Sequence, residues 1–182
     1  MKNNTRSLVL IALFTALTVV GTIIKIPLPT GAFVDLGNAI LLLSVLFLGF
    51  WKGSLAAGLG FAIFDLMNGY AAEAPYFILE SLIVGAVAYS LFSLFNKKPQ
   101  KVWQILVIAV GTGIAKLIMT QIKNTVVQLI VGMSLGPAFL TAATRLPATL
   151  VNVILTALIV SFVYFPLKKA TRRMFEQRHI GE

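Results

Sequence analysis

Residues 8–24 read LVLIALFTALTVVGTII, an uncharged and mostly apolar run. A helix needs roughly 20 mostly apolar residues to cross a membrane, so this run is long enough to form most of a spanning helix. Lys2 and Arg6 precede the run, and it contains no small-residue cleavage motif. We therefore interpret it as a retained first membrane helix and not as a signal peptide.

The same apolar character extends through the whole chain. Of its 182 residues, 58% are hydrophobic and only 12% are charged, about half the charged share of a soluble domain. A soluble globule of this size has too much surface to cover with so few charges. The composition excludes a soluble domain, a disordered chain and a fibrous repeat. It predicts one integral membrane domain over residues 1–182.

Five further apolar segments follow the first, separated by short connections rich in Pro, Gly or Lys. Residues 25–35 hold two prolines and are expected to form a loop, and Lys52–Gly53 is expected to be a tight turn. We predict an all-α membrane protein with six spans at approximately 8–24, 36–51, 54–70, 76–95, 102–131 and 139–165, followed by a basic tail at 166–182.

The charge distribution predicts the orientation of these spans. The formal net charge is +9, and an even number of spans places both termini on one side of the membrane. The positive-inside rule makes the basic side cytoplasmic, so the excess reflects topology and not a nucleic-acid partner. The residues on that side are Lys2, Arg6, Lys52, Lys97, Lys98, Lys101, Lys168, Lys169, Arg172, Arg173 and Arg178.

The rest of the chain is balanced in charge, with Lys25, Lys116, Lys123 and Arg145 against Asp35, Asp65, Glu73 and Glu80. Of these, Lys25, Asp35 and Glu73 fall in outer loops and are expected to be solvated, with a role as a lid left open. Ionisable groups inside spans are costly and mark function by default, so the others are candidate site residues.

Polar residues form stripes along three predicted spans. At about 100° per residue, Arg145, Thr149, Asn152 and Thr156 share one face of the last span. Lipid cannot satisfy such stripes, so we expect them to face one another around an outward-open cavity. The alternative is that acids and bases pair only to hold the bundle together. The candidate binding residues are Asp65, Asn68, Tyr76, Glu80, Lys116, Lys123, Asn124, Arg145 and Asn152.

Aromatic and small residues add two further hypotheses. Tyr70 and Tyr76 flank an outer loop, where they can stack on an aromatic ligand or lie at the membrane interface. Small residues four apart permit close helix contacts, and most such pairs are expected to be internal packing. These pairs are Ala12/Ala16, Gly53/Ala57, Ala56/Gly60 and Ala109/Gly113.

The sequence lacks the residues that metal binding, ATP hydrolysis and enzymatic catalysis usually require. The chain has no Cys, and its one histidine, His179, lies in the tail, so we expect no metal site and no cofactor. The phosphate-binding loop of nucleotide hydrolases is absent, so the chain is not expected to hydrolyse ATP. An intramembrane enzyme is disfavoured for the same reasons. A self-sufficient secondary transporter or channel remains the alternative, although no internal repeat supports it.

Several motifs together resemble the substrate-binding membrane subunits, or S components, of energy-coupling factor (ECF) vitamin transporters. ALFTA at 12–16 is similar to the family's alanine motif, and LGFWKGSLAAG at 48–58 with FDL at 64–66 is similar to its second turn and third helix. RLP at 145–147 with Asn152 resembles its sixth helix. The chain departs from the family at 50–52, where many members have a Gly-Pro turn.

This resemblance implies a multi-pass protein of the prokaryotic plasma membrane that captures a water-soluble vitamin from outside. It implies docking through Ala12 and Ala16 onto a transmembrane scaffold subunit (T component) that carries two ATPases. Within the family, the chain is most similar to the subgroup associated with hydroxymethylpyrimidine or pyridoxine. Both are small, neutral, hydroxylated heteroaromatics, which suits a charge-balanced cavity.

Overall fold

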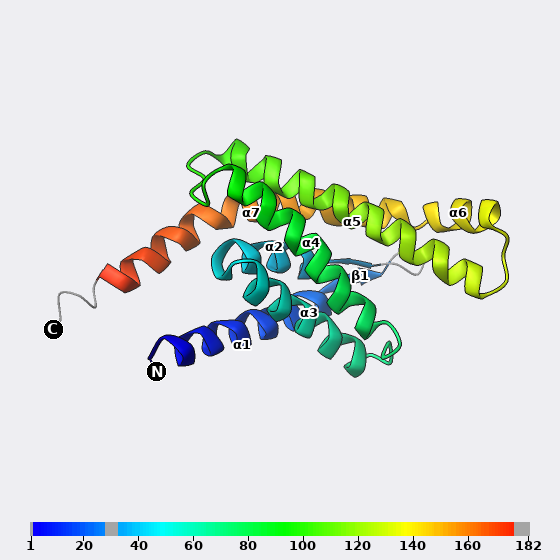
Figure 1. The fold of residues 1–182 in the computed structure, drawn as a ribbon, viewed down its shortest axis with the longest axis horizontal. Helices are drawn as coiled ribbons and strands as arrows, with labels where there is room; N and C mark the ends of the chain where they lie inside the picture. The colour runs from blue at the N-terminus through cyan, green and yellow to red at the C-terminus, as the bar shows by residue number, and fades with distance from the viewer. Residues whose placement is uncertain (1, 28–32, 177–182) are drawn as a thin grey trace.

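A computed structural model describes residues 2–27 and 33–176, and these residues are almost entirely helical (Figure 1). The predicted loop residues 28–32 and tail residues 177–182, which include Arg178 and His179, lie outside the described residues. The elements in order are α1 (Lys2–Ile23), β1 (Lys25–Pro27), β2 (Phe33–Asp35), α2 (Gly37–Leu48), α3 (Phe50–Met67), α4 (Ala74–Leu94), α5 (Val102–Ile130), α6 (Leu135–Ala143) and α7 (Leu146–Glu176).

Four helices in the described part of the chain are long and apolar enough to cross a membrane. They are Thr5–Ile23 within α1, α4, α5, and Leu146–Thr171 within α7. By contrast, α2 has 12 residues and is about 18 Å long, shorter than the hydrocarbon core of about 30 Å. The helical membrane class is confirmed, whereas six spans with cytoplasmic termini stay a prediction.

The turn between α2 and α3 lies at Gly49 and not at the predicted Lys52–Gly53. Gly49 has φ of 81°, in the left-handed region that favours glycine, and its N–H donates to the carbonyl of Val45. Gly53 instead lies inside α3 against the α2 backbone. A Cβ added to Gly53 would come 2.5 Å from the carbonyl oxygen of Ser44. Gly49 is therefore needed for its positive φ, and Gly53 for the close contact between α2 and α3.

Two helices share the residues of the predicted sixth span, 139–165, where a single helix was expected. Residues 139–143 belong to the short helix α6, the chain turns at Thr144 and Arg145, and α7 then continues to Glu176. Pro147 lies in the first turn of α7, where its missing N–H is not required, so a new helix can begin there. The extension of α7 beyond Pro166 is anchored because Lys168 Nζ donates to the carbonyl of Pro99 at 3.2 Å.

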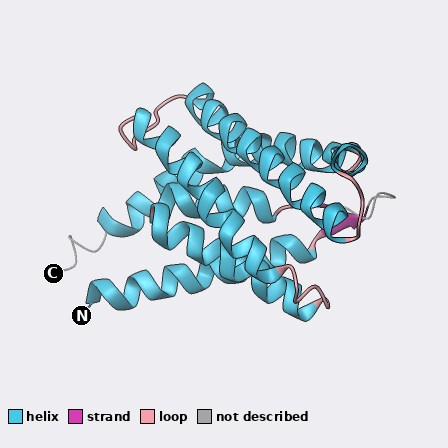
Figure 2. Cartoon of the chain, turned by 45° about the vertical axis from the view of Figure 1, so that its right-hand side comes forward, coloured by secondary structure: helices cyan, strands magenta, loops and turns pink. Residues whose placement is uncertain are grey.

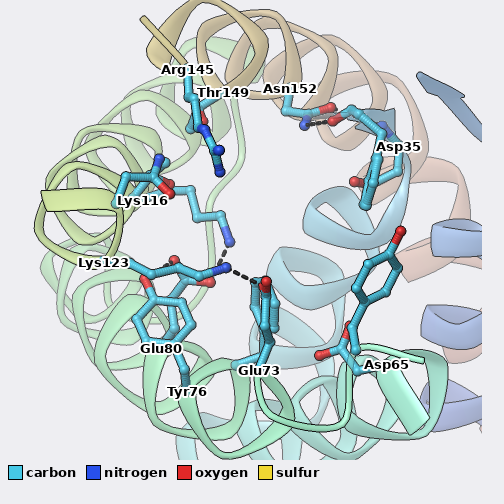
Figure 3. A pocket seen from close by; sticks show the side chains of 15 residues that line it. Asp35, Asp65, Glu73, Tyr76, Glu80, Lys116, Lys123, Arg145, Thr149 and Asn152 are labelled. Atoms are coloured by element: carbon cyan, nitrogen blue, oxygen red, sulfur yellow. Dashed lines mark hydrogen bonds and ion pairs between the residues drawn. The ribbon is translucent and has the colours of Figure 1, made fainter. Parts of the chain in front are cut away.

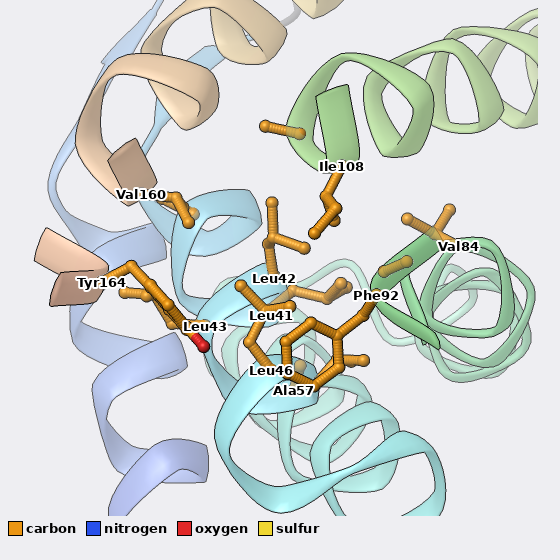
Figure 4. Packing of buried hydrophobic residues seen from close by; sticks show 14 of the residues in the cluster. Leu41, Leu42, Leu43, Leu46, Ala57, Val84, Phe92, Ile108, Val160 and Tyr164 are labelled. Atoms are coloured by element: carbon orange, nitrogen blue, oxygen red, sulfur yellow. The ribbon is translucent and has the colours of Figure 1, made fainter. Parts of the chain in front are cut away.

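The short helix α2 forms the centre of the hydrophobic core. It contacts α1, α3, α4 and α7, and its Leu42 and Val45 are fully buried. In Figure 4, Leu42 and its neighbours on α2 lie among Val84, Ile108 and Val160 from three other helices. Residues 41–46 of α2 are all buried, which explains why they are almost entirely apolar. Ser44 is the exception, and its hydroxyl lies within hydrogen-bond distance of the carbonyls of Leu41 and Gly53.

The loops divide between the two ends of the bundle. Both termini, the α2–α3 turn and the α4–α5 loop lie at one end, whereas the strands, the α3–α4 loop and the α5–α6 loop lie at the other (Figure 1). The rotated view in Figure 2 also shows the strands at the end of the bundle opposite both termini. Part of the predicted loop 25–35 is an antiparallel hairpin, with Lys25 opposite Asp35 and Pro27 opposite Phe33. We call this end of the bundle the hairpin end.

Candidate binding cavity

A polar cavity of about 190 Å³ opens at the hairpin end of the bundle. It lies between the ends of α3, α4, α5 and α7, and β2 covers one side (Figure 3). Positively and negatively charged side chains both line it, as predicted from the polar stripes along the spans. The lining residues are Phe33, Asp35, Asp65, Tyr70, Glu73, Tyr76, Phe77, Glu80, Lys116, Thr120, Lys123, Asn124, Arg145, Thr149 and Asn152.

A buried ion pair joins α4 to α5 on one wall of the cavity. Glu80 is 2% exposed, and its Oε2 accepts a hydrogen bond from Lys116 Nζ. The Tyr76 hydroxyl lies 2.8 Å from Glu80 Oε1 and 3.0 Å from the Met119 carbonyl, and it can donate to one of them at a time. Both oxygens of Glu80 are thus within reach of a donor, as a buried carboxylate requires.

A second ion pair lies at the rim. Lys123 Nζ donates to Glu73 Oε2, and the Glu73 side chain is 43% exposed. Lys123 Nζ also lies 4.6 Å from the Phe77 ring centroid and 5.2 Å from that of Tyr76. Glu73 was expected to be solvated in a loop. Its side chain is partly exposed, and it also bridges the α3–α4 loop to α5 through its ion pair with Lys123.

Asn152 fastens the hairpin to α7. Its Oδ1 accepts a hydrogen bond from the Asp35 N–H, and its Nδ2 donates to the Phe33 carbonyl, both at 2.9 Å. The side-chain amide thereby pairs with β2 as a neighbouring strand would. Asn152 faces the cavity as predicted, but β2 already occupies both ends of its amide. Its observed contacts support a structural role in holding one wall.

Asp35 and Lys25 are also less solvated than predicted. Asp35 Oδ1 accepts from the Gly37 N–H at 2.8 Å, and burial raises the pKa of Asp35 to about 6. Lys25 Nζ lies 4.5 Å from the Phe33 ring centroid and 4.7 Å from that of Phe64, within cation–π range. The hairpin therefore packs on the bundle through its charged residues.

Two charged groups of the cavity have no such partner. Asp65 on α3 is 4% exposed, and its Oδ2 is buried without a hydrogen bond to the described part of the chain. Arg145, in the turn before α7, forms no ion pair with any residue that the structure describes. In Figure 3 its guanidinium points into the cavity from the α7 side, while Asp65 lies on the α3 side.

The structure brings eight of the nine predicted binding residues to this cavity, and their contact with a ligand stays a prediction. The exception is Asn68, which is exposed and closes the end of α3 by donating from Nδ2 to the Phe64 carbonyl at 2.8 Å. The prediction omitted Phe33 and Phe77. Alternation was a usable signal for Phe33, because Phe33 and Asp35 line the cavity while Val34 between them is buried.

The small-residue pairs separate into two groups. Ala56, Ala57 and Ala109 are fully buried, which confirms the internal packing predicted for their pairs. Ala12 and Ala16 are exposed on α1, on the outside of the bundle. They line a shallow apolar groove between α1 and α3, whose other side includes Leu59 and Ile63. We call this surface the α1–α3 groove.

The fold and the cavity together place the chain in the general class of helical membrane proteins with a polar cavity at one end. Residues 2–169 match the family described as ECF-type riboflavin transporter, S component, and the chain belongs to this family of ECF-type S components. A solved structure of the S component of a bacterial ECF transporter has the same fold. Its TM-score is 0.65 at 18% identity, over 92% of this chain and 98% of that chain. No curated protein matches the chain.

Membership confirms the predicted family and the location in the prokaryotic plasma membrane. S components are multi-pass transport subunits and not enzymes. The family's description names riboflavin, so it does not support the subgroup of hydroxymethylpyrimidine or pyridoxine that the sequence suggested. The ligand must therefore be inferred from the chemistry of the cavity.

Proposed function

We propose that this chain captures a small water-soluble vitamin or vitamin precursor and delivers it inward together with an ECF scaffold subunit and two ATPase subunits. The observation that carries the proposal is the polar cavity at the hairpin end, in a chain of the S-component family. Polar groups buried at one end of a membrane bundle are costly unless they serve a ligand or one another. The chain has no ATP-binding loop, so the partners supply the energy.

The cavity favours a small heteroaromatic ligand of low net charge. Among the described residues, four carboxylates and three cations line it, whereas an anionic vitamin would be better matched by a net positive lining. Sites for drug-sized ligands usually occupy about 300–1,000 Å³, and this cavity of about 190 Å³ is smaller. We therefore favour hydroxymethylpyrimidine or pyridoxine, each with a single ring, over the larger riboflavin that the family's description names.

Binding and uptake by the purified chain test this proposal. Calorimetric titration in detergent should detect tight binding of pyridoxine or hydroxymethylpyrimidine, and weaker or no binding of riboflavin. In liposomes the chain alone should bind but not accumulate the vitamin. Accumulation should require the scaffold, both ATPases and ATP. Uptake by the chain alone would instead identify a secondary transporter or channel, and preferential binding of riboflavin would contradict our choice of ligand.

A further inference from the structure

The charged groups of the cavity differ in how far their neighbours already satisfy them. Glu80 pairs with Lys116, and Glu73 pairs with Lys123. These two ion pairs connect α4 and the preceding loop to α5, so they support the wall of the cavity whether or not a ligand is present. The groups that remain for recognition are those without a partner.

Asp65 is one such group. Its Oδ2 is buried and accepts no hydrogen bond from any residue that the structure describes, although it lines a cavity that also contains cations. A buried carboxylate oxygen without a donor costs free energy, and an incoming N–H or O–H group would remove that cost. The site at Asp65 therefore selects a hydrogen-bond donor.

Arg145 is the complementary group. It lines the same cavity and has no carboxylate partner among the side chains that the structure describes. A guanidinium presents a planar set of donors that binds oxygen acceptors in a defined direction. In Figure 3 Arg145 points inward from the α7 side and Asp65 lies on the α3 side. Because both residues line the same cavity, a ligand that spans it would contact both.

We propose that the ligand is a dipolar heteroaromatic molecule that lies across the cavity, with an N–H or O–H donor at Asp65 and an oxygen acceptor at Arg145. This inference rests on the proposed function and adds the orientation of the ligand and the two groups that select it. The Glu80–Lys116 and Glu73–Lys123 pairs act as the frame of the site.

The test combines affinity with the stability of the ligand-free protein. Pyridoxine, hydroxymethylpyrimidine and riboflavin are titrated into the wild type, Asp65→Asn and Arg145→Gln. Each variant should lose roughly tenfold or more in affinity for the probe that the wild type binds, as expected for lost hydrogen bonds to charged groups. Without ligand, Asp65→Asn should melt at the same temperature as the wild type or higher, because it removes an unpaired buried charge.

Matched variants separate recognition from a general effect of charge. Arg145→Lys keeps the charge without the planar fork and should recover only part of the affinity. Lys168→Gln removes a cation at the opposite end and should bind as the wild type does. Wild-type affinity in both Asp65→Asn and Arg145→Gln would overturn this inference alone, as would a lowered melting temperature of ligand-free Asp65→Asn. Failure of the wild type to bind any of the three probes would overturn both this inference and the proposed function.

Discussion

At the scale of single residues, Glu80 shows what a buried charge requires. Glu80→Leu would leave the Lys116 ammonium largely buried without its partner. Removing one member of such a pair costs about 3–5 kcal/mol, whereas replacing both by apolar groups is much milder. We therefore expect Glu80→Leu to lower the free energy of unfolding in detergent by about 3–5 kcal/mol.

The double variant Glu80→Leu/Lys116→Met is the control for this prediction, since it removes both charges. It should recover most of the lost stability, as measured by the same denaturant titration followed by circular dichroism. If the double variant is as unstable as Glu80→Leu, the ion pair is not the source of the effect.

The raised pKa of Asp35 predicts that the stability of the protein depends on pH. Burial is the main cause of its raised pKa, which moves from 3.8 to about 6. The folded state then binds the proton more tightly than the unfolded state does. The contribution of Asp35 to stability therefore falls as the pH rises from about 4 to about 6 and is constant above that range.

Asp35→Asn should remove this dependence while keeping an oxygen that can accept from the Gly37 N–H. The difference in melting temperature between the wild type and Asp35→Asn should change over this pH range and level off above it. A difference that is constant across the range would show that the pKa of Asp35 is close to its ordinary value.

At the scale of secondary-structure elements, α2 and α3 pack unusually closely because of Gly53. A Cβ at this position would lie 2.5 Å from both Ser44 O and Val45 Cα, and neither backbone atom can move without shifting a helix. We expect Gly53→Ala to lower the free energy of unfolding by about 1–3 kcal/mol, the range for overpacking. Gly136→Ala in α6 is the matched control.

No atom of the described residues lies within 4 Å of the Cβ position of Gly136, so Gly136→Ala should be neutral or stabilise the helix by up to about 1 kcal/mol. Denaturant titration of the two variants measures the comparison. Equal effects at the two sites would show that α2 and α3 can separate at little cost.

Much of the arrangement of these elements follows from periodicity in the sequence. Apolar runs predicted the long helices, and polar stripes predicted that Lys116, Asn124 and Asn152 face one cavity. Periodicity did not predict contacts that depend on distant backbone. The partners of Asn152 lie in β2, more than 100 residues earlier, and this pairing exists only after the hairpin forms.

The α2–α3 turn shows the same limit. Gly49 and Gly53 are both suited to a turn by residue type, since either can adopt positive φ. Tertiary packing decides between them, because only Gly53 must lie against α2. The break at Arg145 was missed because apolar residues continue on both sides of it, although Pro147, typical of the first turn of a helix, was a usable signal.

At the scale of the whole molecule, the cavity and the α1–α3 groove are separate surfaces. The groove is apolar and exposed, and none of its residues lines the cavity. We propose that the scaffold subunit docks in this groove, where Ala12 and Ala16 permit close approach between helices. Ala16→Trp would fill the groove without touching the cavity. It should therefore abolish ATP-driven uptake in liposomes while leaving vitamin affinity within about twofold of the wild type.

Leu17→Trp is the control, because Leu17 is exposed on the same helix but lies outside the groove. Both variants bring the same indole into the lipid-exposed surface of α1, so a general effect of tryptophan on insertion or folding would appear in both. Only Ala16→Trp blocks the proposed docking surface. Retained uptake in Ala16→Trp, or equal loss in the two variants, would show that the scaffold docks elsewhere. Loss of vitamin binding in Ala16→Trp would show that the groove and the cavity are coupled within the subunit.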